Sequence, residues 1–508
     1  MVESRVRKTL INAKVNLLFY LLILALSFFS RKIFLDCLGA SFVGLTGTLT
    51  NILGYLNLAE LGIGSAIAFN LYSPLRKGDK QQIIDLISLF GYYYRNIGIV
   101  VCVASAILSI FFPFIFHKTD FSLGVIYFAF YSFLASSLFG YFINYRQILL
   151  TADQKNYVVT AYYQTANIIK IIIQLSVAYY LNNYYLWIVI ELSFSICYCF
   201  ILNWKINQVY PWLKTSVKNG KIQRKNYPQI FTSTKQVFVH KIKDFILTQS
   251  DQLFIFAFVS LKMVAYYGNY VLVISKITSL LSTVLDSVGA SVGNLVAEKN
   301  NNKQLQVFWE LMALRYFFAG FICFCIYNLI TPFITIWLGP EYILSKTVLW
   351  LVLVNLFIMI TRGTIDNFNF AYGHFGDVWA AWTEGILNIA VTIVGGYFWG
   401  VAGILLGKTI SLIPIIVIWK PIYLFKYGFK YPLSHYWVNT AKYYSIFIVS
   451  TITVRILLKH LPDLPDISLG WWFIHACICS FLFGAFYIIL MVIFAPGAKD
   501  LFKRMYKR

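Results

Sequence analysis

The sequence predicts an all-α integral membrane protein with about fourteen transmembrane helices. Three observations predict this class. Of the 508 residues, 59% are hydrophobic and only 12% are charged, whereas soluble domains carry about 25% charged residues. The apolar residues form runs long enough to span a bilayer core, which takes about 20 residues per helix. Aromatic residues make up 19% of the chain, and such rings collect at membrane interfaces.

The predicted helices are the apolar runs between polar, glycine or proline breaks. The first resembles a secretory signal, but no cleavage site of small residues follows before Arg31, so we expect it to be a retained helix. Runs longer than the bilayer core can be accommodated by tilt. In chain order the predicted helices are residues 13–35, 41–72, 83–113, 121–143, 157–180, 184–204, 229–259, 265–296, 307–332, 347–372, 378–398, 401–420, 439–458 and 469–494.

The longest break between these runs divides the chain into lobes. Residues 205–228 are rich in lysine and arginine and contain two prolines. Counting helices on either side predicts two six-helix lobes and two additional helices at the C-terminus, a layout common in transporters built from repeats. The predicted parts are an N-terminal lobe (1–204), a basic cytoplasmic linker (205–228), a C-terminal lobe (229–420), and two further helices with a basic tail (421–508).

The excess of positive charge indicates orientation. The chain has 42 basic and 20 acidic residues, a formal net charge of +22. Most loop lysines and arginines fall on the side that holds both termini, so we expect both termini in the cytoplasm. Arg31 and Lys32 are interpreted as residues of an outer loop. Nucleic-acid binding is excluded, because no polar domain is present to hold a basic patch.

Charged residues inside the predicted helices are the strongest functional signal. An arginine or lysine at a helix centre costs about 2.5 to 3.5 kcal/mol in lipid, so these cations must face counter-charges or a polar cavity. Arg362 and Asp366, four residues apart, are expected to form an ion pair. For the other charges both readings stay open. The deep cations are Arg95, Lys170, Lys276, Arg315, Arg362 and Lys408, and the candidate counter-charges are Glu60, Glu191, Asp244, Asp251, Asp286, Asp366 and Glu384.

Two helices show a polar face. Asn57, Glu60 and Gly64 share a face of the second helix, with Glu60 near mid-membrane. Such a face lines a water-filled cavity or a tight helix contact, and a carboxylate favours the cavity. The interior has nearly as many deep cations as acids, which suits an anionic ligand. The stripe of the eighth helix consists of Ser275, Ser279, Ser282, Asp286, Gly289 and Gly293, with Lys276 at its edge.

Catalytic and metal-binding patterns are absent from the sequence. It contains no phosphate-binding loop, nucleophile elbow or HExxH motif, and the six histidines lack ligand spacing. We therefore expect no catalytic residues, no cofactor and no metal site.

Three segments resemble bacterial polysaccharide flippases of the Wzx type, which translocate O-antigen or capsule repeat units. They are RKIFLDCLGASFVGLTGTLTNILGYLNLAELGIGSAIAFNLYSPLRKGDKQQI (31–83), YRQILLTADQKNYVV (145–159) and QSDQLFIFAFVSLKMVAYYGNYVLVISKITSLLSTVLDSVGASVGNLVAEKN (249–300). The resemblance implies the fold of the multidrug, oligosaccharidyl-lipid and polysaccharide exporter superfamily, with two six-helix bundles around a central cavity. It also implies a bacterial inner-membrane location and an undecaprenyl-pyrophosphate-linked oligosaccharide substrate, moved by alternating access for O-antigen, lipopolysaccharide, capsule or exopolysaccharide synthesis. Partners would be polysaccharide-assembly proteins such as a polymerase and glycosyltransferases.

The resemblance implies a cavity lined by the first, second, seventh and eighth helices. The first helix has no basic residue between Lys14 and Arg31, so we expect Lys276, then Arg95, to meet the pyrophosphate. A buried carboxylate has its pKa raised toward the working range, so such a group can couple transport to protons or sodium ions. The candidate cavity residues are Lys276, Arg95, Glu60, Asp251, Asp286, Lys170, Arg362, Asn57 and Ser279.

Two other functions stay open. A drug or cation antiporter of the multidrug and toxic compound extrusion (MATE) type has the same fold and would favour an acidic, aromatic cavity. A membrane-embedded glycan polymerase or ligase typically carries a large outer loop, whereas the longest outer segments here, 333–346 and 459–468, are short.

Overall fold

The computed structural model describes residues 5–57, 63–227, 250–285, 292–293, 295–296, 298, 300–374, 376–460 and 468–506. Over these residues the regular structure is entirely helical, which confirms the predicted fold class. Nine described stretches are long and apolar enough to cross a membrane. Of these, Lys14–Leu56 covers the first predicted helix and part of the second, and Val378–Phe429 contains the eleventh and twelfth. The chain forms two compact units, Met1–Ala265 and Tyr266–Arg508, so residues 250–259 of the predicted seventh helix group with the first unit.

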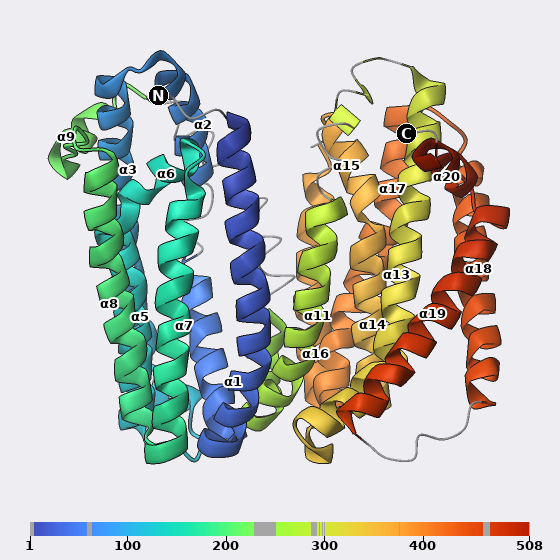
Figure 1. The fold of residues 1–508 in the computed structure, drawn as a ribbon, viewed down its shortest axis with the longest axis horizontal. Coiled ribbons are helices and arrows are strands. Elements are labelled where there is room, and N and C mark those ends of the chain that lie inside the picture. Colours follow the sequence, from blue (N-terminus) through green and yellow to red (C-terminus); the bar gives the residue numbers. More distant parts are fainter. Residues whose placement is uncertain are drawn as a thin grey trace. The chain divides into compact units, whose positions relative to one another are not determined.

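Unit 1 is a bundle of long helices that run up and down (Figure 1). Its core is aromatic and aliphatic: Phe42 stacks on Tyr184 with ring centroids 4.5 Å apart, and Phe112 packs edge-on against Phe130. Short helices join the long ones at the ends of the bundle. The helices are α1 (Arg5–Leu56), α2 (Ile63–Lys77), α3 (Lys80–Ile110), α4 (Phe112–Ile115), α5 (Leu123–Phe142), α6 (Gln147–Ala152), α7 (Asn156–Leu181), α8 (Tyr184–Val209) and α9 (Val217–Gln223).

Helix α1 contains the first predicted helix and residues 41–56 of the second, separated at Gly39, whereas residues 63–72 of the second belong to α2. Gly39 has φ 82° and ψ 158°, a conformation that only glycine adopts readily. The two halves, 5–38 and 40–56, run in opposite directions (Figure 1). Arg31 and Lys32 were counted with an outer loop although the predicted helix 13–35 includes them, and the structure places both inside the first half, before the turn. The apolar run simply continues past them to Gly39.

The predicted linker between the lobes is partly helical, which corrects the simple loop expected there. Helix α8 extends to Val209, and α9 packs along α3. Gly220 permits this contact, because a Cβ atom there would lie 2.1 Å from the carbonyl oxygen of Ser88. The segment between them is held by a hydrogen bond from the Ser216 backbone N–H to Ser88 Oγ at 3.1 Å. Packing against α3 therefore orders a segment whose composition alone indicates a loop.

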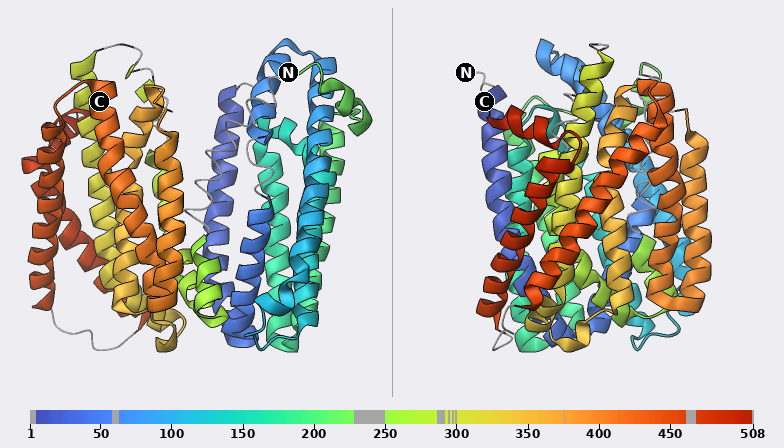
Figure 2. Two further views of the ribbon diagram at one scale, coloured as in Figure 1. Left: turned by 180° about the vertical axis from the view of Figure 1, so that it is seen from behind. Right: turned by 90° about the vertical axis from the view of Figure 1, so that its right-hand side faces the viewer.

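Unit 2 is also a helical bundle (Figures 1 and 2). Its predicted tenth helix is broken at Arg362 into two helices, and its twelfth continues beyond residue 420 through two π-helical segments, Ile413–Trp419 and Leu424–Phe429. Pro414 lies in the first of these segments and Pro421 in the α-helical turn between them, and each proline removes a backbone N–H donor from the helix. The helices are α11 (Leu261–Leu285, which begins in unit 1), α13 (Asn301–Trp337), α14 (Lys346–Thr361), α15 (Gly363–Ala371), α16 (Val378–Leu412), α17 (Lys420–Tyr423), α18 (Leu433–Lys459), α19 (Leu469–Phe494) and α20 (Ala498–Tyr506).

Helix α16 contains a tight hairpin of two antiparallel helices. The reversal is at Gly400, which has φ 54° and ψ −131°. Beyond it Gly403 faces Gly395, and further along Thr392 Oγ1 donates to the carbonyl oxygen of Ile404 at 3.3 Å. In a bilayer, helices associate through close packing rather than the hydrophobic effect, so paired glycines are what allow the two backbones to touch.

Replacing Gly403 with alanine is expected to destabilise this hairpin. A Cβ atom at position 403 would lie 1.9 Å from the carbonyl oxygen of Gly395, and a backbone atom cannot move aside as a flexible side chain can. Overpacking of this kind costs about 1 to 3 kcal/mol. Thermal unfolding of the purified protein in detergent measures the loss. Gly385→Ala is the matched control, because its Cβ atom would meet nothing within 4 Å. Equal melting temperatures for the two variants would contradict the prediction.

The last two long helices dock on α13 through buried tyrosines. Tyr443 of α18 stacks on Tyr316 at 4.6 Å and donates to the carbonyl oxygen of Pro496 at 2.7 Å. Tyr487 of α19 donates to the carbonyl oxygen of Tyr316 at 3.0 Å. Figure 2 shows these helices within unit 2. At the end of the chain α20 is tied to α13 by the Arg504–Glu310 ion pair, at 2.9 Å. The buried hydroxyls of Tyr443 and Tyr487 thus both donate to backbone carbonyl oxygens, as burial of a hydroxyl requires.

Candidate functional site

Unit 1 contains a polar cavity of about 640 Å³. Its wall is built mainly by the second half of α1, whose lining residues recur every three or four positions and so share one helical face. This periodicity runs from Val43 to Asn57 and is visible in the sequence. Of the residues on this face, only Asn57 was predicted to line a cavity. The polar lining residues are Arg31, Thr46, Thr50, Asn51, Asn57, Ser136, Ser137, Glu191 and Gln252.

Hydrogen bonds between helices fix the walls. The Asn51 amide donates to Gln252 Oε1 at 2.7 Å, which joins α1 to the segment around residue 252. The Asn57 amide donates to Ser137 Oγ at 3.1 Å, and this hydroxyl lies 3.3 Å from Asn57 Oδ1, which joins α1 to α5. These side-chain hydrogen bonds fix the positions of α1, α5 and the segment around residue 252 relative to one another.

Two charged side chains lie among the described lining residues, one of each sign. Arg31 donates through Nη2 to the carbonyl oxygen of Ala265 at 3.0 Å, a neutral partner. Glu191 accepts from Lys170 Nζ at 2.7 Å and from the Gln174 amide at 3.0 Å. Arginine stays protonated, and Lys170 balances the charge of Glu191.

The structure places the nine predicted cavity residues very differently. Asn57 lines the cavity, Lys170 reaches it through Glu191, and Asp251 is buried beside the lining residue Gln252. Arg95 is exposed and lines a separate hollow of about 420 Å³ with Gly91 and Tyr141. In unit 2, Lys276 is half-buried and Ser279 exposed on α11. Glu60 and Asp286 lie outside the described residues.

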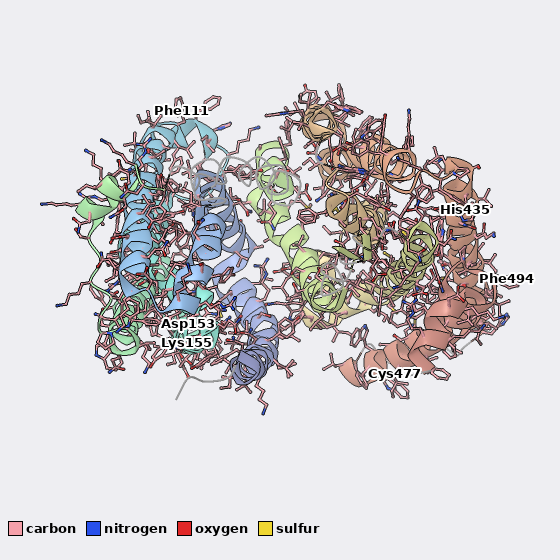
Figure 3. The ribbon with its side chains drawn as sticks, turned by 90° about the horizontal axis from the view of Figure 1, so that it is seen from above. Phe111, Asp153, Lys155, His435, Cys477 and Phe494 are labelled. Carbon is pink, nitrogen blue, oxygen red and sulfur yellow. The ribbon has the colours of Figure 1, made fainter. Side chains whose placement is uncertain are left out.

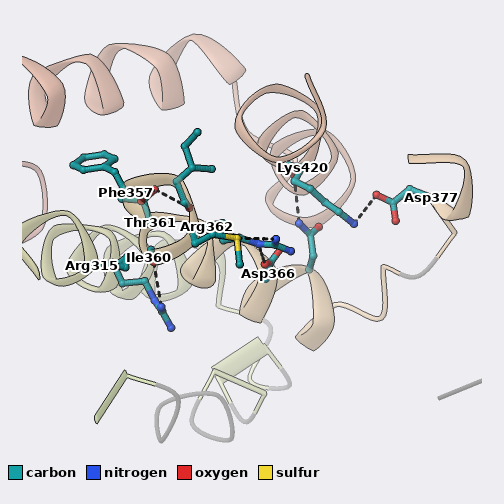
Figure 4. A network of polar contacts seen from close by, with 11 residues as sticks. Arg315, Phe357, Ile360, Thr361, Arg362, Asp366, Asp377 and Lys420 are labelled. Carbon is teal, nitrogen blue, oxygen red and sulfur yellow. Dashed lines mark hydrogen bonds and ion pairs between the residues drawn. The ribbon is translucent and has the colours of Figure 1, made fainter. Parts of the chain in front are cut away.

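Arg362 belongs to a network of ion pairs and hydrogen bonds in unit 2 (Figure 4). Its Nε donates to Asp366 Oδ2 at 2.6 Å, which confirms the predicted pair. Nearby, Lys420 Nζ lies 2.7 Å from Asp377 Oδ2, and the carbonyl oxygen of Lys420 accepts from the Asn369 amide at 3.3 Å. The Arg362–Asp366 pair spans the break between α14 and α15, and the hydrogen bond from Asn369 joins α15 to α17. Its geometry favours a structural role for Arg362.

Among solved structures the fold is similar to that of known transporters. A lipid II flippase, MurJ, in its inward closed conformation, has a TM-score of 0.68 and 17% sequence identity, and the match covers 98% of this chain and 100% of that one. The likeness concerns the fold alone. An inward-facing multidrug resistance MATE transporter of the MOP superfamily matches with a TM-score of 0.52 and 12% identity over 81% of this chain and 97% of that one.

A third solved structure is that of a mutant of the Vibrio cholerae MATE transporter VcmN. It has a TM-score of 0.50 and 13% identity over 84% of this chain and 99% of that one. No family model matches the sequence, and no curated protein matches it. The match to the flippase spans nearly the whole of both chains, so α18 and α19 are part of the shared fold.

Proposed function

We propose that the protein is a flippase for lipid-linked oligosaccharides. In this proposal it turns undecaprenyl-pyrophosphate-linked repeat units of an O-antigen, capsule or exopolysaccharide from the inner to the outer leaflet of the bacterial cytoplasmic membrane. The observation that carries the proposal is the cavity of unit 1, which holds about 640 Å³ and is lined by amide and hydroxyl side chains together with the guanidinium of Arg31. The fold similarity to a lipid II flippase supports the same class of cargo.

The cavity matches the head of such a substrate chemically. A pyrophosphate needs cationic and neutral donors to replace water, and guanidinium groups bind phosphate oxygens strongly. Sugar hydroxyls need mixed donors and acceptors, which Asn51, Asn57 and Gln252 provide. The polyprenyl tail stays in the lipid. Alternating access then moves only the polar head through the protein.

Deleting the gene tests the proposal. We expect the lipid-linked oligosaccharide to accumulate on the cytoplasmic leaflet while surface polysaccharide is lost, and a plasmid copy of the gene to restore both. Radiolabelled lipid extraction and a leaflet-specific glycan probe measure the two quantities. Unchanged surface polysaccharide with no accumulated intermediate would contradict the proposal.

The second candidate function is a drug or cation antiporter, which the fold similarity to two MATE transporters favours. Its readout is different. Deletion would increase sensitivity to cationic dyes such as ethidium and slow their efflux, with surface glycan unchanged.

We further propose that translocation is coupled to a proton or sodium gradient through a buried carboxylate, with Asp251 as the described candidate. Polysaccharide-assembly enzymes on either side of the membrane are the proposed partners. Translocation is measured in vesicles loaded with substrate. A protonophore, which collapses the proton gradient, tests coupling to protons, and replacing sodium with potassium tests coupling to sodium. Translocation unaffected by both treatments would show that coupling is absent.

A further inference from the structure

A second polar pocket lies in unit 1, apart from the cavity described above. It holds about 500 Å³ and shares no lining residue with that cavity. One side of the pocket is formed by Arg146, which follows α5, and by Asn203 and Asn207 of α8. Another side is formed by Lys214, in the segment after α8. The pocket therefore lies at the end of the bundle where α6 and α9 are found (Figure 1).

The guanidinium of Arg146 bridges to α8 without meeting an acid. Nη1 donates to Asn207 Oδ1 at 2.8 Å, and Nη2 donates to Asn203 Oδ1. Both partners are neutral, so they satisfy hydrogens but leave the positive charge uncompensated. Burial lowers the pKa of Arg146 from its ordinary value, which reflects the cost of desolvating this cation. An anion in the pocket would offset that cost.

The polar groups that remain available in the pocket are donors. Since Asn203 and Asn207 turn their oxygens toward Arg146, their amide N–H groups face away from it. Lys214 is exposed, and its Nζ meets no acceptor in the described part of the chain. Among the described residues that line the pocket there is no aspartate or glutamate. The nearest acid along the chain, Asp153, is already held by Lys155 at 2.7 Å and by the Tyr210 hydroxyl at 2.8 Å (Figure 3 labels Asp153 and Lys155).

The surroundings of the pocket are those of a membrane surface. Phe142, which lines it, has 44% of its surface exposed, and Trp204, between Asn203 and Lys205, has 57% exposed. Exposed aromatic rings next to lysines are typical of the level of the lipid headgroups. A cluster of cations between helices at this level can hold an anionic headgroup.

We propose that this pocket binds a phosphate group, with Arg146 and Lys214 as the charged donors and Asn203 and Asn207 as neutral donors. The phosphate comes from the headgroup of an anionic membrane phospholipid or from a soluble phosphate of the cytoplasm. Bound there, it would tie α5, α8 and the segment around residue 214 together, and so stabilise unit 1. The site is independent of the cargo that the larger cavity carries.

Thermal unfolding of the full chain in detergent, with added phosphatidylglycerol, phosphatidylcholine or inorganic phosphate, tests the proposal. For the wild type we expect phosphatidylglycerol to raise the melting temperature and phosphatidylcholine to leave it unchanged. Inorganic phosphate distinguishes the sources: a response to phosphatidylglycerol alone indicates a lipid, and a response to both indicates a site for free phosphate as well. Arg146→Gln should weaken the apparent affinity about tenfold and Lys214→Gln severalfold, as loss of a charge-assisted hydrogen bond implies.

The matched control is Lys205→Gln. Lys205 is a cation of α8 near the pocket, but it lies two residues from both Asn203 and Asn207 and so faces another side of the helix. Its Nζ donates to Gln208 Oε1 at 3.3 Å. Its response should equal that of the wild type. Arg146 also joins two helices, so its variant can fail to fold. The exposed Lys214 does not carry this risk. If Lys214→Gln responds to both probes as Lys205→Gln does, the proposal is wrong.

Discussion

Replacing Arg31 with alanine is expected to reduce translocation of the lipid-linked substrate about tenfold to a hundredfold. The guanidinium is the one cation among the described lining residues of the larger cavity, and hydrogen bonds to charged groups contribute about 1.5 to 3 kcal/mol. Arg31→Lys keeps the charge but not the planar fork, so it should retain part of the activity. The rate at which fluorescent lipid-linked oligosaccharide is flipped in proteoliposomes measures the effect.

Lys32→Ala is the control for this experiment. Lys32 is the next residue, is exposed and does not line the cavity. We expect its rate to equal that of the wild type. Arg31 also donates to the carbonyl oxygen of Ala265, so the melting temperature of each variant must be compared. A fully folded Arg31→Ala protein with normal translocation would contradict the role of Arg31 in binding the anion.

Replacing Glu191 with alanine is expected to destabilise the protein by about 3 kcal/mol, the lower end of the range for breaking a buried ion pair. The lower end applies because the Glu191 side chain keeps 27% of its surface exposed and the Lys170 side chain keeps 16%. Without Glu191, the ammonium of Lys170 and the amide of Gln174 lose their shared acceptor. Denaturant or thermal unfolding in detergent measures the loss.

A surface pair of unit 2 provides the matched control. The Lys303–Glu298 pair has the same kind of geometry, at 2.6 Å, but both side chains are 50% exposed, so Glu298→Ala should cost about 0 to 1 kcal/mol. The double variant Lys170→Met with Glu191→Leu removes both charges and should recover most of the stability. Equal melting temperatures for Glu191→Ala and the wild type would show that this pair contributes nothing to folding.

The helices were predictable because a bilayer imposes a simple rule on the sequence. Backbone groups in lipid must be satisfied within a helix, so each apolar run of sufficient length becomes one. Residues 121–143 and 184–204 were predicted and the structure has Leu123–Phe142 and Tyr184–Val209. The Arg362–Asp366 pair was also predictable, because both members lie on one helix face four residues apart.

The candidate site was predicted only in part. Asn57 was found from the polar face of its own helix, and Lys170 from the cost of burying a cation. Arg31 was missed because a pair of basic residues after an apolar run is typical of a membrane boundary, and nothing local says that the helix continues to Gly39. Its partner, the carbonyl oxygen of Ala265, is 234 residues away along the chain.

The sequence by itself determined that this chain is a bundle of membrane helices, where most of them begin and end, and that some of its buried charges must be paired. Only the tertiary structure decided that Lys170 pairs with Glu191, that Arg31 lines a cavity and that Arg95 does not line that cavity. The reason is that hydropathy and helical periodicity depend on residues a few positions apart. A cavity, in contrast, depends on which faces of distant helices meet, and this is fixed by contacts such as Asn51 to Gln252.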